Sequence, residues 1–232
     1  MRTYELMVPC HFGLEAVLKR EIYDLGYEIE RVEDGRVTFL GDEEAICRAN
    51  IFLRTAERVM IQVGRFKATT FEELFQGIKN LPWEEYIPED GKFWVKKASS
   101  INSKLFSPSD IQSIAKKAMV ERMKQKYHKE WFKEDGAAYP VRIFLLKDEV
   151  TVALDTSGDS LHKRGYRTMT SKAPLTETLA ASLIMLTPWR KDRILVDDPD
   201  AAPIWPRYSE LSDNRPFFAT REGVKVYDLR EV

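Results

Sequence analysis

The chain has 232 residues, of which 44% are hydrophobic and 31% charged, and its formal net charge is −1. These values describe a globular protein of one large or two to three small domains. No apolar run is long enough to cross a bilayer, and the first residues form no charged-then-apolar leader, which predicts a cytoplasmic protein without a membrane partner. Two separate cysteines and three scattered histidines argue against a disulfide framework or a zinc site.

The first 66 residues predict a small domain of six elements. In order, these are a strand at 4–13, a helix at 14–26, two strands within 27–42, a helix beginning at Asp42 and a strand near 59–66. Asp42 is placed to cap its helix, and Gly35 suits the turn between the paired strands. The order β-α-β-β-α-β is typical of the ferredoxin-like fold, so we expect a ferredoxin-like domain over residues 1–66.

A second α/β unit is predicted over residues 67–168. Its elements are a helix from Thr70 to about Asn80, a strand at 91–99, a helix at 107–127 and a hairpin at 139–158. Thr70 and Glu73 have the spacing of a capping box, and Ser107 or Ser109 caps the long helix. The fold class is therefore α+β.

A third segment, 169–197, contains an apolar helix at 173–189 with proline near each end, and a short strand that ends at Asp197. We expect this segment to resemble the start of a nucleotide-binding α/β domain. Residues 198–232 are expected to form an irregular tail.

Basic residues are concentrated in the middle of the chain. From Lys92 to Lys133 there are eleven Lys and Arg against three Asp and Glu, a local net charge of +8. From Ser160 to Arg193 there are seven against two, a net of +5. A phosphate-binding surface requires clustering of this kind, so a nucleic-acid partner is compatible with the nearly neutral total.

The run ALDTSGDSLHKRGYR (153–167), followed by APLTETLAASLIMLTPW (173–189), resembles the corresponding junction of THUMP-containing rRNA guanine-N2 methyltransferases. The resemblance covers residues 1 to about 197. It implies a ferredoxin-like domain, then an RNA-binding THUMP domain, then a Rossmann-like domain that binds S-adenosylmethionine. Structured RNA, rRNA in particular, is the partner that it implies.

The sequence departs from this family after Val196. The family continues with a glycine-rich cofactor loop, whereas this chain continues DPDAAPIWPRY and has no glycine between Gly165 and Gly223. Because such a loop must bring backbone N–H groups against the ligand, we expect no cofactor in this chain and no catalytic residue. Glu177 resembles a residue at the edge of the family's cofactor pocket. The tail faintly resembles the C-terminal stretch of a pectate lyase family, and we interpret the chain as truncated.

Ten residues are candidates for contacts with RNA: Lys96, Lys97, Ser103, Lys104, Lys116, Lys117, Lys163, Arg164, Tyr166 and Arg167. The first six lie on the strand and near the start of the long helix, where helix N–H groups add donors for phosphate oxygens. The run HKRGYR (162–167) offers guanidinium groups and an aromatic ring to a backbone or an unstacked base.

Each of these sites has a structural alternative. The helix lysines can be a solvated face, and the arginines of HKRGYR can dock the third segment onto the second domain. Four aromatic residues could stack on bases, but positions in a strand and at a helix end favour the core: Phe93, Trp94, Trp131 and Phe132.

Three functions therefore remain open. The first is an RNA-binding module that holds structured RNA through its phosphates. The second is an S-adenosylmethionine-dependent rRNA guanine-N2 methyltransferase, as in full-length family members. The third is an inactive fragment whose exposed helix at 173–189 binds a catalytic-domain partner or a second copy of the chain.

Overall fold

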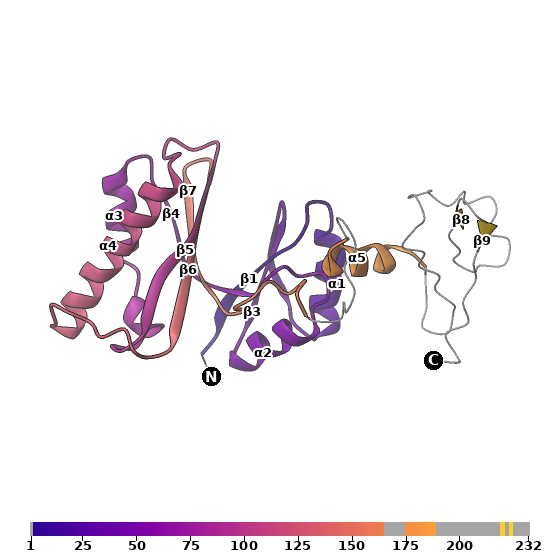
Figure 1. Ribbon diagram of the computed structural model, residues 1–232, viewed down its shortest axis with the longest axis horizontal. Coiled ribbons are helices and arrows are strands. Elements are labelled where there is room, and N and C mark those ends of the chain that lie inside the picture. The colour runs from indigo at the N-terminus through magenta and orange to yellow at the C-terminus, as the bar shows by residue number, and fades with distance from the viewer. Residues whose placement is uncertain (1, 165–174, 189–218, 221–222, 225–232) are drawn as a thin grey trace. The chain divides into compact units, whose positions relative to one another are not determined.

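The structure is a computed structural model that describes residues 2–164, 175–188, 219–220 and 223–224. The chain forms two compact units, Met1–Leu179 and Ala180–Val232. The first unit is built on a seven-stranded sheet of order β2-β3-β1-β4-β7-β6-β5 (Figure 1).

The first six elements have the predicted ferredoxin-like order. They are β1 (Tyr4–Pro9), α1 (Glu15–Asp24), β2 (Ile29–Glu33), β3 (Arg36–Gly41), α2 (Glu43–Phe52) and β4 (Met60–Lys67). Strand β3 lies between β1 and β2 and is antiparallel to both. Asp42 caps α2 by accepting a hydrogen bond from the Ala45 backbone N–H at 2.9 Å. Gly35 turns the chain between β2 and β3 at a φ of 75°, which favours glycine.

The next elements form the second predicted unit. They are α3 (Phe71–Lys79), the short 3₁₀ helix η1 (Trp83–Glu85), β5 (Lys92–Ile101), α4 (Pro108–Tyr127), β6 (Ala138–Leu146) and β7 (Glu149–Asp155). Thr70 and Glu73 form the predicted capping box, and Ser107 caps α4. Strands β5 and β6 are parallel with α4 as their crossover, whereas Lys147 and Asp148 turn β6 into antiparallel β7.

Strand β4 belongs to both sets of elements. It pairs with β1 at Met60 and Ile61, and with β7 from Met60 to Lys67. The predicted domain boundary at residue 66 therefore falls on a strand that pairs with β1 at its start and with β7 along its length. No linker separates the two sets, and they share one continuous sheet.

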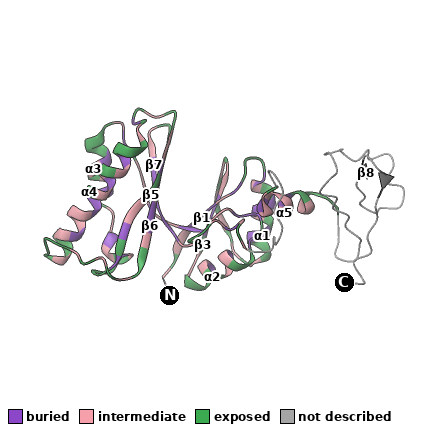
Figure 2. Cartoon of the chain, in the orientation of Figure 1, coloured by how far each residue is buried: buried purple, intermediate pink, exposed green. Residues whose placement is uncertain are grey.

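The four helices α1–α4 cover the same face of this sheet. Ile61 on β4 is paired with Leu6 on β1 and with Leu154 on β7, and it packs against both helix-covered cores. Met7 and Met60 point to the opposite face, where they form a small separate cluster. Buried residues lie along the sheet and on the helices that cover it (Figure 2). The opposite face of the sheet has no helix over it among the described residues.

The third segment differs in extent from its prediction. Helix α5 runs from Glu177 to Leu186, shorter than the predicted 173–189, because Leu175 and Thr176 are not helical and the chain turns at Thr187. Proline at 188 cannot continue a helix, which explains this end. The predicted strand before Asp197 lies outside the described residues.

In the tail, β8 (Ala219–Thr220) and β9 (Gly223–Val224) form a two-stranded antiparallel sheet. Among the residues described, no helix is both long and apolar enough to cross a membrane.

Candidate functional site

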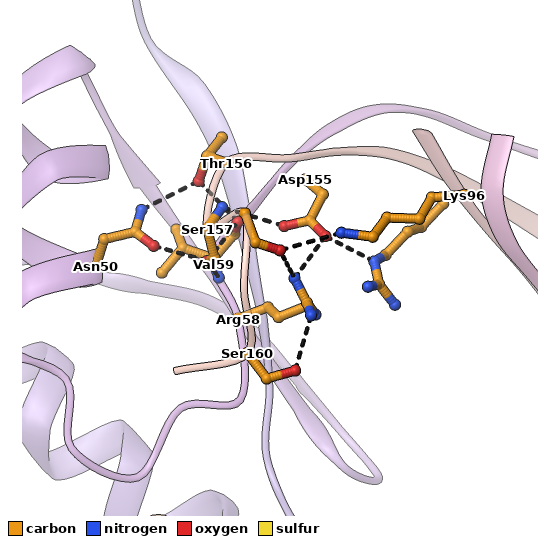
Figure 3. A network of polar contacts seen from close by, with 10 residues as sticks. Asn50, Arg58, Val59, Lys96, Asp155, Thr156, Ser157 and Ser160 are labelled. Carbon is orange, nitrogen blue, oxygen red and sulfur yellow. Dashed lines mark hydrogen bonds and ion pairs between the residues drawn. The ribbon is translucent and has the colours of Figure 1, made fainter. Parts of the chain in front are cut away.

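The segment that follows β7 is anchored by one buried carboxylate. The Asp155 side chain is fully buried and accepts hydrogen bonds from Arg58 Nη1 at 2.7 Å and Arg142 Nε at 2.8 Å. Arg58 also donates to the Gly158 carbonyl at 2.8 Å and to Ser160 Oγ at 2.7 Å. Figure 3 shows this network at the end of β7. Asp155 thus fixes two arginines, and one of them fixes the chain that leaves the sheet.

The same segment is bonded to α2 and to the start of β4. Ser157 Oγ donates to Asn50 Oδ1 at 2.6 Å and accepts from the Val59 backbone N–H at 2.8 Å. Thr156 Oγ1 donates to the Val59 carbonyl at 2.7 Å (Figure 3). The short hydroxyl side chains of Thr156 and Ser157 therefore join elements from both halves of the sheet.

A groove of about 530 Å³ lies beside this network. Its walls carry the aromatic rings of Tyr4, Tyr86, Trp94 and Tyr139, and Lys96 also lines it. Lys96 Nζ donates to the Gly158 carbonyl at 3.1 Å, so the same lysine borders both the groove and the Asp155 network. The groove combines aromatic surface with charges of both signs, because Glu85 and Asp155 line it together with Lys96.

Several predicted contact residues have structural roles in this structure. Lys116 Nζ lies 3.6 Å from the centre of the Phe93 ring and pairs with Glu134 at 2.7 Å. Ser103 Oγ accepts from the Asp148 backbone N–H at 2.9 Å, and the Lys104 backbone N–H donates to Asp148 Oδ1 at 2.7 Å. These bonds hold the loop after β5 against the β6–β7 turn.

The run HKRGYR is described only as far as Arg164, and Tyr166 and Arg167 lie outside the described residues. The Arg164 guanidinium donates to the Ile51 carbonyl at 2.6 Å and the Leu53 carbonyl at 2.5 Å, where α2 ends. A cation is favourable at this end of a helix. Arg164 therefore docks its segment onto the first set of elements, whereas the structural alternative expected the second domain.

Many cations of the basic run are neutralised by nearby carboxylates. Arg122 makes two hydrogen bonds to Glu84, which hold the pKa of that carboxyl below its usual value. Lys126 also pairs with Glu84, and Lys124 pairs with Glu130. Glu84 and Glu134 lie outside the counted stretch and reduce its charge of +8, whereas Glu130 is already counted within it.

The remaining cations have no carboxylate within 4.0 Å in the described part of the chain. Within 92–133 these are Lys92, Lys96, Lys97, Lys104, Lys117 and Lys133. All six are exposed and lie on β5, on α4 or in the loops beside them. Lys163, after β7, is exposed and without an ion pair as well. Three of these six lysines, Lys92, Lys96 and Lys97, lie on β5, the edge strand of the sheet.

The aromatic candidates are divided between core and surface. Phe93 is buried, Trp94 lines the groove, and Phe132 packs edge-on against Tyr127. Trp131 is 72% exposed, so the interpretation of this residue as core is wrong. It lies after the end of α4, beyond the helix positions that pack on the sheet.

Glu57 joins three distant segments. It pairs with His11 Nε2 and with His162 Nδ1, both at 3.3 Å, and accepts a hydrogen bond from Thr178 Oγ1 at 2.6 Å. Burial first, and nearby carboxylates second, raise the pKa of the neighbouring Cys10 thiol to about 12. No group of three or more side chains suited to a metal ion occurs in the described residues.

Three protein-family models match successive stretches of the chain. Residues 5–60 match the RlmL ferredoxin-like domain and residues 68–155 the THUMP domain. Residues 164–199 match the RMKL-like methyltransferase domain. YpsC of Bacillus subtilis (strain 168), whose name describes it as a candidate RNA methyltransferase, is 50% identical over 199 residues, 85% of this chain and 51% of its own. The chain belongs to the THUMP-containing methyltransferase family.

The chain is also similar to other proteins named as methyltransferases or methylases. A tRNA (guanine(6)-N2)-methyltransferase of Methanocaldococcus jannaschii is 32% identical over 80% of this chain and 50% of its own. The crystal structure of a possible methylase from Clostridium difficile 630 has a TM-score of 0.82 and 50% identity, covering 86% of this chain and 53% of that one. The chain spans about half the length of these relatives. Residues 183–232 also match the Pectic acid lyase family, as the tail suggested.

Proposed function

We propose that this member of the THUMP-containing family binds structured RNA, and that its ferredoxin-like part (1–66) and THUMP part (67–168) form the binding module. The observation that carries the proposal is the set of unpaired lysines at the β5 edge, which lie within the part of the chain that matches the THUMP domain. Lysines with no carboxylate partner are free to neutralise phosphates, and releasing counterions from those phosphates favours binding.

The RNA is proposed from the relatives' names together with this charge. One relative is named as a tRNA methyltransferase and another as a candidate RNA methyltransferase. The sequence prediction named rRNA, so tRNA and rRNA are both included among the ligands to test. Phosphate contacts fix position without reading sequence, so we expect similar affinity for unrelated RNAs of the same fold.

Fluorescence anisotropy with a labelled tRNA transcript and a labelled rRNA hairpin, titrated at several salt concentrations, tests the proposal. We expect a steep fall of log K with log salt concentration. Replacing Lys97 and Lys117 with glutamine is expected to flatten that slope by about one for each lost contact. Lys124→Gln is the matched control, because Lys124 is already paired with Glu130 at 2.9 Å. If the unmodified chain binds neither RNA at low salt, the proposal is wrong and the inactive-fragment alternative remains.

A second proposal is methyl transfer, which the match of residues 164–199 to a methyltransferase domain favours. The residues that follow Val196 do not fit S-adenosylmethionine, because the stretch without glycine offers no close backbone approach to the ligand. We therefore derive no catalytic step for this chain, and we propose that residues 169–197 connect the module to a catalytic partner. Calorimetry with S-adenosylmethionine tests whether this chain itself can carry out methyl transfer. Micromolar binding would show that the residues after Val196 do fit the cofactor, contrary to our assessment.

A further inference from the structure

We infer that Arg142, together with Lys96 and Lys97, forms a phosphate-binding site on the sheet face that the helices leave uncovered. The inference rests on the proposed RNA binding and names the residues of one contact. Arg142 was not among the sequence candidates.

Arg142 is held in place but keeps most of its hydrogen-bonding capacity. Its neighbours on β6, Val141 and Ile143, are buried in the helix-covered core, so the arginine points to the opposite face. Its Nε donates to Asp155 Oδ2 at 2.8 Å, whereas its two terminal nitrogens make no hydrogen bond to any described residue. Those two nitrogens carry four N–H groups in a planar fork, a geometry that suits two phosphate oxygens.

The positive charge around Asp155 exceeds what this carboxylate can neutralise. Oδ2 is shared by Arg58 and Arg142, and Oδ1 accepts from the Ser157 backbone N–H at 3.1 Å. Lys96 donates to the Gly158 carbonyl, to which Arg58 also donates, so a third cation lies beside this pair without bonding to the carboxylate. The side chains of both arginines are only 11–12% exposed, and unneutralised charge is costly at such depth. A bound anion would relieve that cost.

A bulge in β5 brings two lysines opposite this arginine. The register of β5 against β6 shifts between Val95 and Lys97, and Lys97 is paired with Arg142. The bulge thus sets Lys96 and Lys97 against one residue of the neighbouring strand. Lys97 is exposed and has no ion pair in the described part of the chain, so its ammonium is available to a ligand at Arg142.

Arg122 on α4 differs from Arg142 in how its guanidinium group is bonded. Its Nε and Nη2 both bond to Glu84, a carboxylate that Lys126 shares at 3.7 Å, so the guanidinium is already bonded to a carboxylate through two nitrogens. Arg65 likewise lies between Glu33 at 2.9 Å and Glu149 at 2.5 Å. Arg142 differs from both, because its two terminal nitrogens make no hydrogen bond to any described residue.

The experiment compares Arg142→Gln and Lys97→Gln with the control Arg122→Gln in the salt-dependent RNA titration. We expect each of the first two variants to lower the slope by about one and to bind about tenfold more weakly at low salt, with the slope of the control unchanged. Lys97→Gln keeps the test valid if Arg142→Gln fails to fold, because Lys97 is exposed and unpaired. RNA binding that is unchanged in both variants would overturn the inference while leaving the proposed function intact.

Inorganic phosphate alone is the second probe, read as the thermal midpoint of unfolding. We expect phosphate to raise the midpoint of the unmodified chain and of Arg122→Gln, and to have a smaller effect on Arg142→Gln. A phosphate effect that depends on Arg142 in a chain that binds no RNA would support the site and reject the RNA proposal. Failure to bind RNA with no such phosphate effect would reject both.

Discussion

Replacing Asp155 with alanine tests whether this carboxylate joins the two halves of the sheet. Its side chain is fully buried and accepts from Arg58, Arg142 and the Ser157 backbone N–H. The substitution leaves two guanidinium groups, each nearly nine-tenths buried, without their counter-charge. The consequence should be a large loss of stability and no change of fold.

The magnitude follows from the bonds that remain. Removing one partner of a buried ion pair costs about 3–5 kcal/mol. Arg58 keeps its bonds to the Gly158 carbonyl and to Ser160 Oγ, which offset part of this cost. We therefore expect a loss of about 3 kcal/mol, at the lower end of that range. This is a large part of the typical free energy of unfolding, about 5–15 kcal/mol. For a chain of this size that corresponds to a fall of roughly 6–12 °C in Tm.

Urea unfolding followed by circular dichroism measures the effect, with Asp155→Asn as the companion variant. Asparagine keeps the shape and one acceptor oxygen but loses the charge, so it should be destabilised less than alanine. A loss below about 1 kcal/mol for Asp155→Ala, with an unchanged m-value, would refute the reasoning, since it would mean that the two arginines need no buried counter-charge.

Two further predictions concern Arg164 and Glu84. Arg164→Gln should destabilise the chain by about 2 kcal/mol in urea unfolding, because it removes bonds to the carbonyls that end α2, and should leave the salt slope of RNA binding unchanged. A flattened slope with unchanged stability would instead favour the predicted RNA contact. The hydrogen bonds from Arg122 lower the pKa of Glu84 in the folded state. Their contribution to stability is therefore complete above the unfolded-state pKa of 4.5 and is lost as the pH falls below it. Acid titration of Arg122→Gln should show a shallower loss of stability in that window than the unmodified chain, and equal slopes would contradict the assignment.

The elements of the first unit could be predicted because each depends on local sequence. The Asp42 cap, the capping box at Thr70 and Glu73, and the turn at Gly35 all occur where their residue types require them. The shared strand β4 could not be predicted in this way. Its two edges pair with β1 and with β7, which is about 90 residues later in the sequence, and no local pattern specifies such a pairing.

The candidate site was predicted less well, because charge counted along a sequence ignores partners that folding brings close. Glu84 and Glu134 lie outside the stretch 92–133, yet they neutralise Arg122 and Lys116 within it. Arg142, which we propose as a phosphate contact, was not predicted, because a single arginine in an apolar strand has no distinctive spacing. Only the register against Lys97 and the bond to Asp155 distinguish it.

The shared strand also bears on how the module would hold an RNA. Because β4 is hydrogen-bonded on both edges, the ferredoxin-like and THUMP parts cannot move apart without breaking a ladder of the sheet. Asp155, at the end of β7 opposite Met60, secures that same ladder and orients Arg142. A rigid sheet would therefore present its cations at fixed spacing to the phosphates of a structured RNA, and a flexible linker between the parts would not.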